Sequence, residues 1–282
     1  MTIGIIGLGL IGGSLAMSLR RHTPCEVLGY DIDRATMLRA RAVDAVSDEL
    51  TDERLPECDI VLVALYPAQC VEYIAAHAEL FRPGALVFDC AGVKRWVCAR
   101  VEPIAAARDW VFIGGHPMAG REFSGFAYAR ADLFANASMI LCPSAGVSIE
   151  ARERAKRFFL DAGFKMVRFC APEEHDQMIA YTSQLAHIVS GAYVKNPLAA
   201  RHKGFSAGSF LDMTRVARMN AGMWTELLLD NGDLLLPALD DLIGRLREYR
   251  EALSSGDPLA LEPVLQEGNL CKQALDPEDG VR

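Results

Sequence analysis

TIGIIGLGLIGGSLAMS, residues 2–18, is the stretch of sequence that decides the fold. Its first part, residues 3–6, is a short apolar run with β-branched members, which predicts a buried parallel strand. The run leads into a G-x-G-x-x-G element made by Gly7, Gly9 and Gly12. In such an element the first glycine permits a tight turn, the second lets the backbone approach a pyrophosphate, and the third lets the next helix pack close to the strand. With a helix expected over residues 14–20, the stretch predicts the start of a dinucleotide-binding α/β domain.

A second strand, expected over residues 26–30, ends next to Asp31, which lies 19 positions after Gly12. A carboxylate at this place can accept hydrogen bonds from an adenine ribose and repels a 2′-phosphate, so the predicted cofactor is NAD. Arg34 keeps NADP open as the alternative. Free N–H groups at the start of the helix would face the phosphates. Three further residues are predicted to contact the cofactor: Leu10, Ile11 and Leu65. A glycine-rich turn in another α/β fold is the other interpretation of the motif.

Composition restricts the class of protein. The chain has 282 residues, 51% of them hydrophobic, which is enough for a sizeable core and two domains. Its formal net charge of −8 argues against a nucleic-acid surface. The eight cysteines show no C-x-x-C pair and no zinc spacing, so we expect reduced core thiols, a cytoplasmic protein and no metal. Because the chain enters a strand at once and no apolar run reaches the ~18 residues of a membrane span, neither a signal peptide nor a membrane helix is expected.

Strand and helix patterns alternate through the first 170 residues. Further strands are expected at 59–65, 85–89, 110–113, 138–141 and 165–169, and helices at 35–42, 94–107 and 148–162. Repeated units of this kind predict a Rossmann-type, doubly wound parallel sheet in residues 1–170, with ligands at the carboxyl ends of the strands.

Strand signals stop after residue 171, so residues 171–282 are predicted to form an all-helical C-terminal domain. Its helices are expected over 210–219, over 223–230, through a leucine-rich stripe at 242–253, and from 257 onward. A domain of this size is small for independent stability, and we expect it to form a homodimer. Packing within a single chain stays open, because core stripes and interface stripes look alike.

The second informative stretch is GGHPMAGREFSG, residues 114–125, which follows a predicted strand and therefore lies at the ligand-binding edge. His116 precedes a proline, which favours an extended backbone. A dehydrogenase that oxidises an alcohol needs a base for the hydroxyl proton, and histidine suits this because its pKa lies near working pH. Glycines on both sides would let a substrate or nicotinamide ring come close. Glu122 is predicted to orient the imidazole or to meet polar groups of the substrate.

These stretches together resemble the prephenate/arogenate dehydrogenase family of tyrosine biosynthesis. The resemblance runs from residue 3 to residue 231 through GLGLIGGSLA, GGHPMAGREFSG, LFANASMILCP, HDQMIAYTSQLAHIVSGAYV and FLDMTRVARMNAGMW. It implies a nucleotide-binding domain followed by a helical dimerisation domain. It also implies an NAD(P)-dependent oxidative decarboxylation, of prephenate to 4-hydroxyphenylpyruvate or, as the alternative, of arogenate to tyrosine. The implied partner is this small-molecule substrate.

The resemblance also implies residue roles. His116 would be the base for the hydroxyl at ring carbon C4, and Arg215 would pair with a substrate carboxylate, as a bidentate guanidinium can. Asp212, three residues earlier, would share a helix face with Arg215. His187 would line the substrate pocket and is assigned to the catalytic group. Two substrate-binding residues are expected on the helix face of His187: Ser183 and Gln184.

Two positions depart from the common family pattern and leave the substrate open. Gly92 stands where many members carry a serine that contacts substrate or nicotinamide, and Gln184 replaces a frequent histidine. Gly92 is still predicted to line the substrate site. Lys94 either binds an anionic substrate or only decorates the start of a helix.

Two rival functions remain. A β-hydroxyacid dehydrogenase would use a lysine base on an interdomain helix, but Lys195 stands near a helix end, a poor place for it. A non-catalytic NAD-sensing or scaffold protein would have no need of His116 and Arg215.

Overall fold

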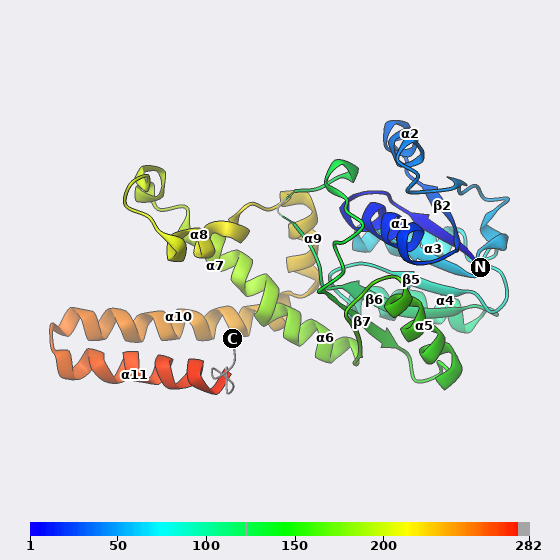
Figure 1. Ribbon diagram of the computed structural model, residues 1–282. Helices are drawn as coiled ribbons and strands as arrows, with labels where there is room; N and C mark the ends of the chain where they lie inside the picture. Colours follow the sequence, from blue (N-terminus) through cyan, green and yellow to red (C-terminus); the bar gives the residue numbers. More distant parts are fainter. Residues whose placement is uncertain (122, 276–282) are drawn as a thin grey trace. The chain divides into compact units, whose positions relative to one another are not determined.

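The structure, a computed structural model, describes residues 1–121 and 123–275 (Figure 1). The chain divides into two compact units, Met1–Gly232 and Asp233–Arg282. The first unit holds an eight-stranded sheet with the strand order β3-β2-β1-β4-β5-β6-β7-β8. The strands are β1 (Thr2–Ile6), β2 (Glu26–Tyr30), β3 (Asp48–Glu49), β4 (Ile60–Val63), β5 (Leu86–Asp89), β6 (Val111–Pro117), β7 (Ser138–Pro143) and β8 (Met166–Phe169).

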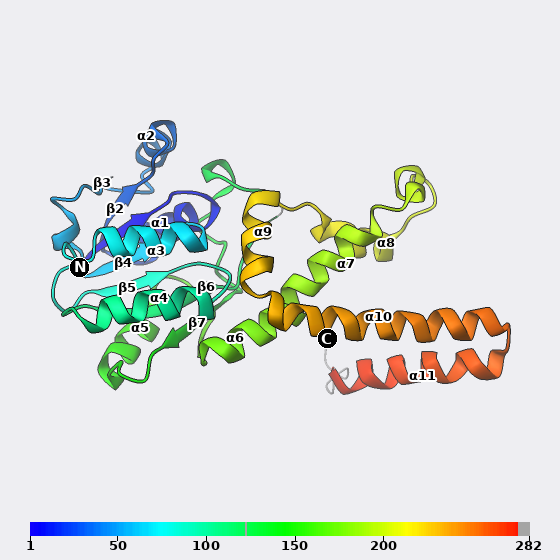
Figure 2. The same cartoon turned by 180° about the vertical axis from the view of Figure 1, so that it is seen from behind.

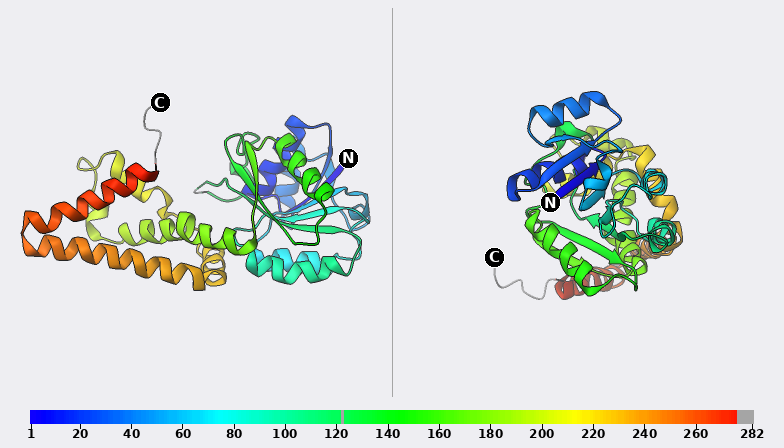
Figure 3. Two further views of the ribbon diagram at one scale, coloured as in Figure 1. Left: turned by 90° about the horizontal axis from the view of Figure 1, so that it is seen from below. Right: turned by 90° about the vertical axis from the view of Figure 1, so that its right-hand side faces the viewer.

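Helices cover both faces of this sheet (Figures 2 and 3). They are α1 (Leu10–His22), α2 (Arg34–Ala42), α3 (Pro67–Ala76), α4 (Arg95–Ala106) and α5 (Ile149–Asp161). Alternate side chains of the buried strands point to opposite faces, which gives two apolar cores. One core joins the sheet to α1, α2 and α5, and the other joins it to α3 and α4. The prediction of a Rossmann-type doubly wound sheet followed by helices is confirmed.

One strand pair departs from the predicted parallel order. β6 and β7 are antiparallel, whereas the other neighbours in the sheet are parallel. A parallel return needs a crossover of a dozen or more residues, usually a helix. The described part of this connection, residues 118–121 and 123–137, contains only the short 3-10 helix η2 (Phe126–Tyr128). β6 is also longer than expected and includes His116, which was predicted to follow the strand.

The glycine turn after β1 has the backbone that the motif predicts. Gly7 has φ +82°, and a Cβ there would lie 2.6 Å from the carbonyl oxygen of Ala64. A Cβ on Gly12 would lie 1.9 Å from the carbonyl oxygen of Gly7, so α1 packs against the turn only with glycine at this position. A Cβ on Gly9 would meet nothing within 4 Å. The first and third glycines are therefore required by the fold itself, and the second faces open space.

The helices that follow the sheet pack on the starts of two sheet-covering helices. They are α6 (Pro172–Ile179), the π-helix η3 (Ala180–Leu185), α7 (Ala186–Tyr193), the 3-10 helix η4 (Pro197–Arg201), α8 (Gly208–Thr214), the 3-10 helix η5 (Arg215–Ala217) and α9 (Ala221–Asp230). Asp176 accepts hydrogen bonds from the backbone N–H groups of Lys94 and Arg95 at the start of α4, at 2.7 and 2.9 Å. Glu226 accepts one at 2.5 Å from Ala68 at the start of α3. These contacts explain why the first compact unit extends to residue 232, and the domain boundary at 171 stays a prediction.

The second unit contains α10 (Gly232–Ser255) and α11 (Pro258–Leu275), which lie side by side in Figures 1 and 2. Arg245 of α10 and Glu267 of α11 approach to 3.7 Å. Asp257 accepts a hydrogen bond from the N–H of Leu259, which confirms the predicted start of the last helix. None of the helices in the described part of the chain combines the length and the apolar character that a membrane span requires.

Candidate active site

A pocket of about 300 Å³ lies beside the glycine turn. It brings together Gly7, Asp31 and Leu65, three of the predicted cofactor contacts. Asp31 follows β2 directly, and its carboxylate accepts hydrogen bonds from the N–H of Leu8 at 2.8 Å and of Asp33 at 2.9 Å. The predicted contacts Leu10 and Ile11 form the start of α1, whose N-cap Gly9 provides no side chain to occupy the free N–H groups. The pocket therefore has a fixed carboxylate, which suits a ribose, and the open N-terminus of α1 that follows the glycine turn suits a pyrophosphate.

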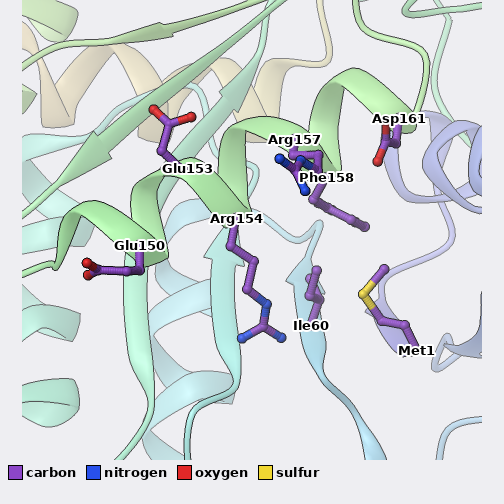
Figure 4. A pocket seen from close by; sticks show the side chains of 8 residues that line it. All are labelled: Met1, Ile60, Glu150, Glu153, Arg154, Arg157, Phe158 and Asp161. Carbon is purple, nitrogen blue, oxygen red and sulfur yellow. The ribbon is translucent and has the colours of Figure 1, made fainter.

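A second pocket, of about 340 Å³, lies elsewhere (Figure 4). It is lined by Met1, at the amino-terminal end of β1, by Ile60, the first residue of β4, and by charged residues of α5. The guanidinium of Arg154 in this pocket donates to the backbone carbonyls of Gly84 and Asp59. Since this is the amino-terminal edge of the sheet and holds none of the predicted site residues, it is separate from the candidate site.

His116 lies half-buried near the end of β6, where it pairs with Ile140 of β7. The turn after β5 passes close to its ring, because a Cβ built on Gly92 would lie 3.9 Å from His116 Nε2. The same Cβ would lie 3.3 Å from a methyl group of Leu227 on α9. Gly92 thus borders the Nε2 side of His116 and also lies next to Leu227, and its role in lining the substrate site stays a prediction.

The other ring nitrogen of His116 begins a hydrogen-bonded chain. His116 Nδ1 lies 2.8 Å from His175 Nε2, and His175 Nδ1 lies 2.7 Å from Asp176 Oδ1. A carboxylate accepts hydrogen bonds, so His175 carries its proton on Nδ1 and offers a lone pair at Nε2. His116 must then donate from Nδ1, which leaves its Nε2 as a lone pair facing Gly92. The chain therefore fixes the tautomer of His116 in which Nε2 can take a proton.

The electrostatics of this chain keep both imidazoles neutral. Burial lowers the pKa of His116 well below its usual value, and the neighbouring His175 and Lys94 lower it further. Burial also lowers the pKa of His175, although the carboxylate of Asp176 opposes this shift. Burial opposes ionisation of Asp176, but hydrogen bonds from His175 and from two backbone N–H groups outweigh it and hold the pKa of Asp176 below its usual value. His116 is therefore neutral and can accept a proton at Nε2. Through His175, the ionised Asp176 can stabilise the positive charge that the ring then gains.

A second cluster surrounds His187 on α7. Its Nδ1 donates to the backbone carbonyl of Ser183 at 2.9 Å, which leaves Nε2 as an acceptor. The ring lies against Trp224 of α9, with ring centroids 4.1 Å apart. Burial lowers the pKa of His187, the hydrogen bond to Ser183 opposes this shift, and the charge of Arg215 adds to the lowering. Arg215 is exposed at the start of η5, which packs against α7. The cluster combines an aromatic wall, an acceptor and a cation, which suit an anionic organic substrate.

Helix α9 connects the two clusters. Leu227 lies next to Gly92, and Trp224, three residues earlier on the same helix face, packs on His187. The predicted residues His116, Gly92 and His187 thus lie along one face of α9. Arg215 lies in η5, which packs against the helix that carries His187.

Two predicted substrate contacts are corrected by the structure. The side chain of Lys94 is fully buried and forms an ion pair with Asp89, so it neither reaches a substrate nor decorates an exposed helix start. Gln184 is 2% exposed, and its amide donates to the carbonyl of Leu227 and accepts from Asn231. Gln184 therefore holds α9 against the π-helix η3 and has no face turned to a substrate.

The remaining predicted residues differ in how the structure treats them. Ser183 is half-buried and contributes its carbonyl to His187. Asp212 lies exposed on α8, which ends at Thr214, so Arg215 begins the 3-10 helix η5 instead of continuing the helix expected over 210–219. Glu122 lies outside the described residues. Lys195, the base that a β-hydroxyacid dehydrogenase would need, is exposed beyond the end of α7.

Three residues of the site were missed by sequence reasoning: His175, Asp176 and Trp224. His175 and His116 are 59 positions apart, and no local pattern links them. The adjacent histidine and aspartate that open HDQMIAYTSQLAHIVSGAYV were the available signal, because an aspartate next to a histidine can orient the ring.

Two family models match the chain and together cover most of it. Residues 15–168 match the model described as prephenate dehydrogenase, nucleotide-binding domain. Residues 171–267 match the model described as prephenate dehydrogenase, dimerization domain.

Individual proteins show the same likeness. The chain is 30% identical over 291 residues to the cyclohexadienyl dehydrogenase of Zymomonas mobilis. The alignment covers 99% of this chain and 98% of the relative. Its fold is similar to prephenate dehydrogenase from A. aeolicus in complex with hydroxyphenyl propionate and NAD+, with a TM-score of 0.86 and 26% identity over 98% of both chains. Arogenate dehydrogenase from Synechocystis gives a TM-score of 0.79 and 28% identity, over 98% of this chain and 100% of that one.

Proposed function

Since the chain belongs to the prephenate dehydrogenase family, we propose that it oxidises prephenate with NAD+ and releases carbon dioxide to give 4-hydroxyphenylpyruvate. The observation that carries the proposal is the chain from Asp176 through His175 to His116. It leaves a neutral Nε2 facing Gly92 at the ligand-binding edge of the sheet. That nitrogen is the base which oxidation of a secondary-alcohol-like carbon requires.

The pocket beside the glycine turn fits NAD+. Gly7 and Gly9 leave the backbone free of side chains, the start of α1 offers N–H groups to the pyrophosphate, and Asp31 offers its carboxylate to the adenine ribose. When bound, NAD+ supplies the hydride acceptor. The proposed role of residues 1–170 is to hold this cofactor, and that of 171–282 is to supply the substrate pocket and the dimer contacts.

The chain's own residues would hold the substrate and move one proton. Arg215 would bind a substrate carboxylate, with His187 and Trp224 beside it as acceptor and aromatic wall. The Nε2 of His116 would take the proton of the C4 hydroxyl, and the imidazolium charge would be stabilised through His175 by Asp176. Once C4 is a ketone, loss of the ring carboxylate as carbon dioxide makes the ring aromatic, which drives the reaction forward. Leu227 would exclude water from the Nε2 side of His116.

A parallel assay tests the proposal and separates the alternatives. Purified protein is given prephenate or arogenate with NAD+ or NADP+, and reduced cofactor is followed by its absorbance. We expect the highest kcat/KM with prephenate and NAD+. Turnover of arogenate alone would assign the protein to arogenate oxidation, and binding of NAD+ without turnover of either acid would contradict the proposal in favour of a non-catalytic NAD-binding protein.

Replacement of Asp31 by serine is expected to weaken NAD+ binding by about 10- to 100-fold, because hydrogen bonds to a charged group contribute about 1.5–3 kcal/mol. NADP+ affinity should fall less or rise, because the carboxylate no longer repels a 2′-phosphate. Titration calorimetry with both cofactors measures this. Asp33→Ser is the matched control: Asp33 caps α2, and serine caps a helix about as well, so neither stability nor cofactor affinity should change much. Unchanged NAD+ affinity in the Asp31 variant would count against the ribose role.

We also propose a homodimer and a cytoplasmic location. The matched dimerization model and the exposed leucines of α10 and α11, among them Leu246, Leu253 and Leu265, support self-association. Sedimentation at the mass of a monomer across the micromolar range would contradict it. Five of the eight cysteines are buried in the core, where a thiol packs as a small apolar group, which fits a reducing compartment.

A further inference from the structure

A buried ion pair stands directly behind the candidate site and has no part in the function proposed so far. Lys94, at the start of α4, and Asp89, the last residue of β5, are each 0% exposed, and their side chains form an ion pair. Burial favours loss of the lysine proton, but the charge of Asp89 outweighs it and raises the pKa of Lys94, so the lysine stays charged. Such a pair contributes little or no net stability after desolvation. Its contacts therefore indicate what it does.

Both charged side chains hold the backbone of the same residue. The N–H of Gly115 donates to Asp89 Oδ1 at 3.0 Å, and the carbonyl of Gly115 accepts from Lys94 Nζ at 2.6 Å. The strand ladder between β5 and β6 ends at the pair Phe88 and Ile113. After Ile113, β6 makes no further ladder pair with β5. There the side chains of Asp89 and Lys94 hold the backbone of β6 that leads into His116.

The same carboxylate also holds the opposite wall of the site. Asp89 Oδ2 accepts a hydrogen bond at 3.0 Å from the N–H of Ala91, which fixes the turn that carries Gly92. Gly92 in turn faces His116 Nε2. One ion pair thus connects the two backbone segments on either side of the proton-accepting nitrogen.

The glycine pair before His116 has the same cause. A Cβ on Gly114 would lie 2.6 Å from Cys98 Sγ and 3.3 Å from Lys94 Cδ. A Cβ on Gly115 would lie 2.6 Å from the carbonyl oxygen of Asp89. Glycines here were expected to make room for a substrate or nicotinamide ring, but the space is taken by Cys98, the stem of Lys94 and the backbone at the end of β5. The absence of a side chain at Gly114 leaves room for the stem of Lys94, and at Gly115 it lets β6 approach the end of β5.

We propose that Lys94 and Asp89 are positioning residues that hold His116 in register with the turn at Gly92, by binding the N–H and the carbonyl of Gly115. The proposal rests on the proposed role of His116 as the base. The ion pair would affect the rate through the position of the His116 ring, since a displacement of about 1 Å in a reacting group can cost about 100-fold in rate. The cofactor pocket beside Gly7 and the cluster around Arg215 are not held by this pair.

Two variants test the clamp. Lys94→Met leaves a buried aspartate without a counter-charge and can fail to fold. The double variant Asp89→Asn with Lys94→Met removes both charges and keeps an acceptor for the N–H of Gly115, but the carbonyl of Gly115 loses its donor. We expect the double variant to melt within about 5 °C of the parent and to bind NAD+ within about threefold, with kcat about 100-fold lower and KM changed by less than about threefold. Arg82→Met, which removes a half-exposed ion pair with Asp59, is the control and should leave kcat unchanged.

An NMR titration separates this proposal from the substrate assignment. Among the described residues, the charged and titratable groups that act on the His116 ring, directly or through the hydrogen-bonded chain, are His175 and Asp176 from α6 and Lys94 from α4. Since Lys94 lowers the pKa of His116, the double variant should titrate at higher pH, and its ring signals should broaden as the orientation is lost. This readout needs no substrate, so it stands even if prephenate is not turned over. A folded double variant with parental kcat, or with unchanged His116 signals and pKa, would overturn the proposal.

Discussion

Replacement of His116 by asparagine is expected to lower kcat by about 1,000-fold, because removal of a general base typically costs 10²- to 10⁴-fold. Asparagine keeps a polar side chain of similar size at the end of β6, but its amide cannot take a proton at neutral pH. Steady-state formation of NADH from prephenate measures the change. The KM for prephenate should move much less than kcat, since the substrate carboxylates are assigned to the cluster around Arg215.

A matched histidine variant controls for general effects. His22, the last residue of α1, is exposed, and its Nδ1 donates to the backbone carbonyl of Ser18 at the end of the helix away from the glycine turn. His22→Asn should therefore keep the parental kcat. Binding of NAD+ to the His116 variant should also be unchanged, which shows that the fold is intact. Parental turnover in His116→Asn would remove His116 from the mechanism.

The pH dependence of the parent enzyme follows from the environment of the same ring. A base must be neutral, so kcat/KM falls as pH drops through the pKa of His116. Burial first, and then His175 and Lys94, lower that pKa well below its usual value. The acid limb of the profile should accordingly lie well below the unperturbed histidine value of about 6.5, with a plateau through neutral pH. An acid limb at or above 6.5 would mean that the free ring is not held in the neutral state described here.

The sequence alone was sufficient to predict features that depend on residues close together in the chain. The turn at Gly7 needs a positive φ and no side chain, and Asp31 follows directly from the end of a strand, so motif spacing located both. His116 was singled out for the same reason, because it stands in a short element at a strand end. Its place inside β6 was missed, because the antiparallel return of β7 depends on pairing between distant segments.

The rest of the site depends on burial and on contacts between distant residues. Lys94 at a helix start looks like a solvated lysine in sequence, and only its ion pair with Asp89 shows otherwise. Gln184 occupies a helical position beside His187, but the π-helix η3 turns it into the junction with α9. His175 acquires its role only when α6 docks on the start of α4. No periodic pattern within a single sequence indicates that two distant helices pack against each other in this way.

Replacement of Arg215 is expected to have the largest effect on substrate binding. Arg215→Gln should raise the KM for prephenate by about 100-fold, since a charge-assisted bidentate contact contributes about 1.5–3 kcal/mol. Arg215→Lys keeps the charge but loses the fork, so it should recover only part of the loss. Initial rates over a range of prephenate concentrations measure both. Arg201→Gln, which removes an exposed arginine from η4, is the control and should leave KM unchanged.

An independent signal should accompany this change. The charge of Arg215 contributes to the lowered pKa of His187, after burial. In Arg215→Gln the pKa of His187 should therefore rise, and NMR titration of its ring can show this without substrate. If KM rises while His187 titrates as in the parent, the guanidinium does not act on the cluster described here.

The chemistry of prephenate makes the effect on KM informative about which carboxylate Arg215 binds. Both carboxylate-bearing groups are on ring carbon C1, opposite the C4 hydroxyl, so His116 and Arg215 would act at opposite ends of the ring. The side-chain carboxylate keeps its charge throughout the reaction, and binding it equally in ground and transition states changes KM and not kcat.

The ring carboxylate is lost as carbon dioxide. The product retains only the side-chain carboxylate, so inhibition by 4-hydroxyphenylpyruvate distinguishes the two. If Arg215 binds the side chain, the inhibition constant in Arg215→Gln rises by the same factor as KM. If it binds the ring carboxylate, product inhibition stays as in the parent while KM rises. A variant in which neither constant changes would remove Arg215 from substrate binding altogether.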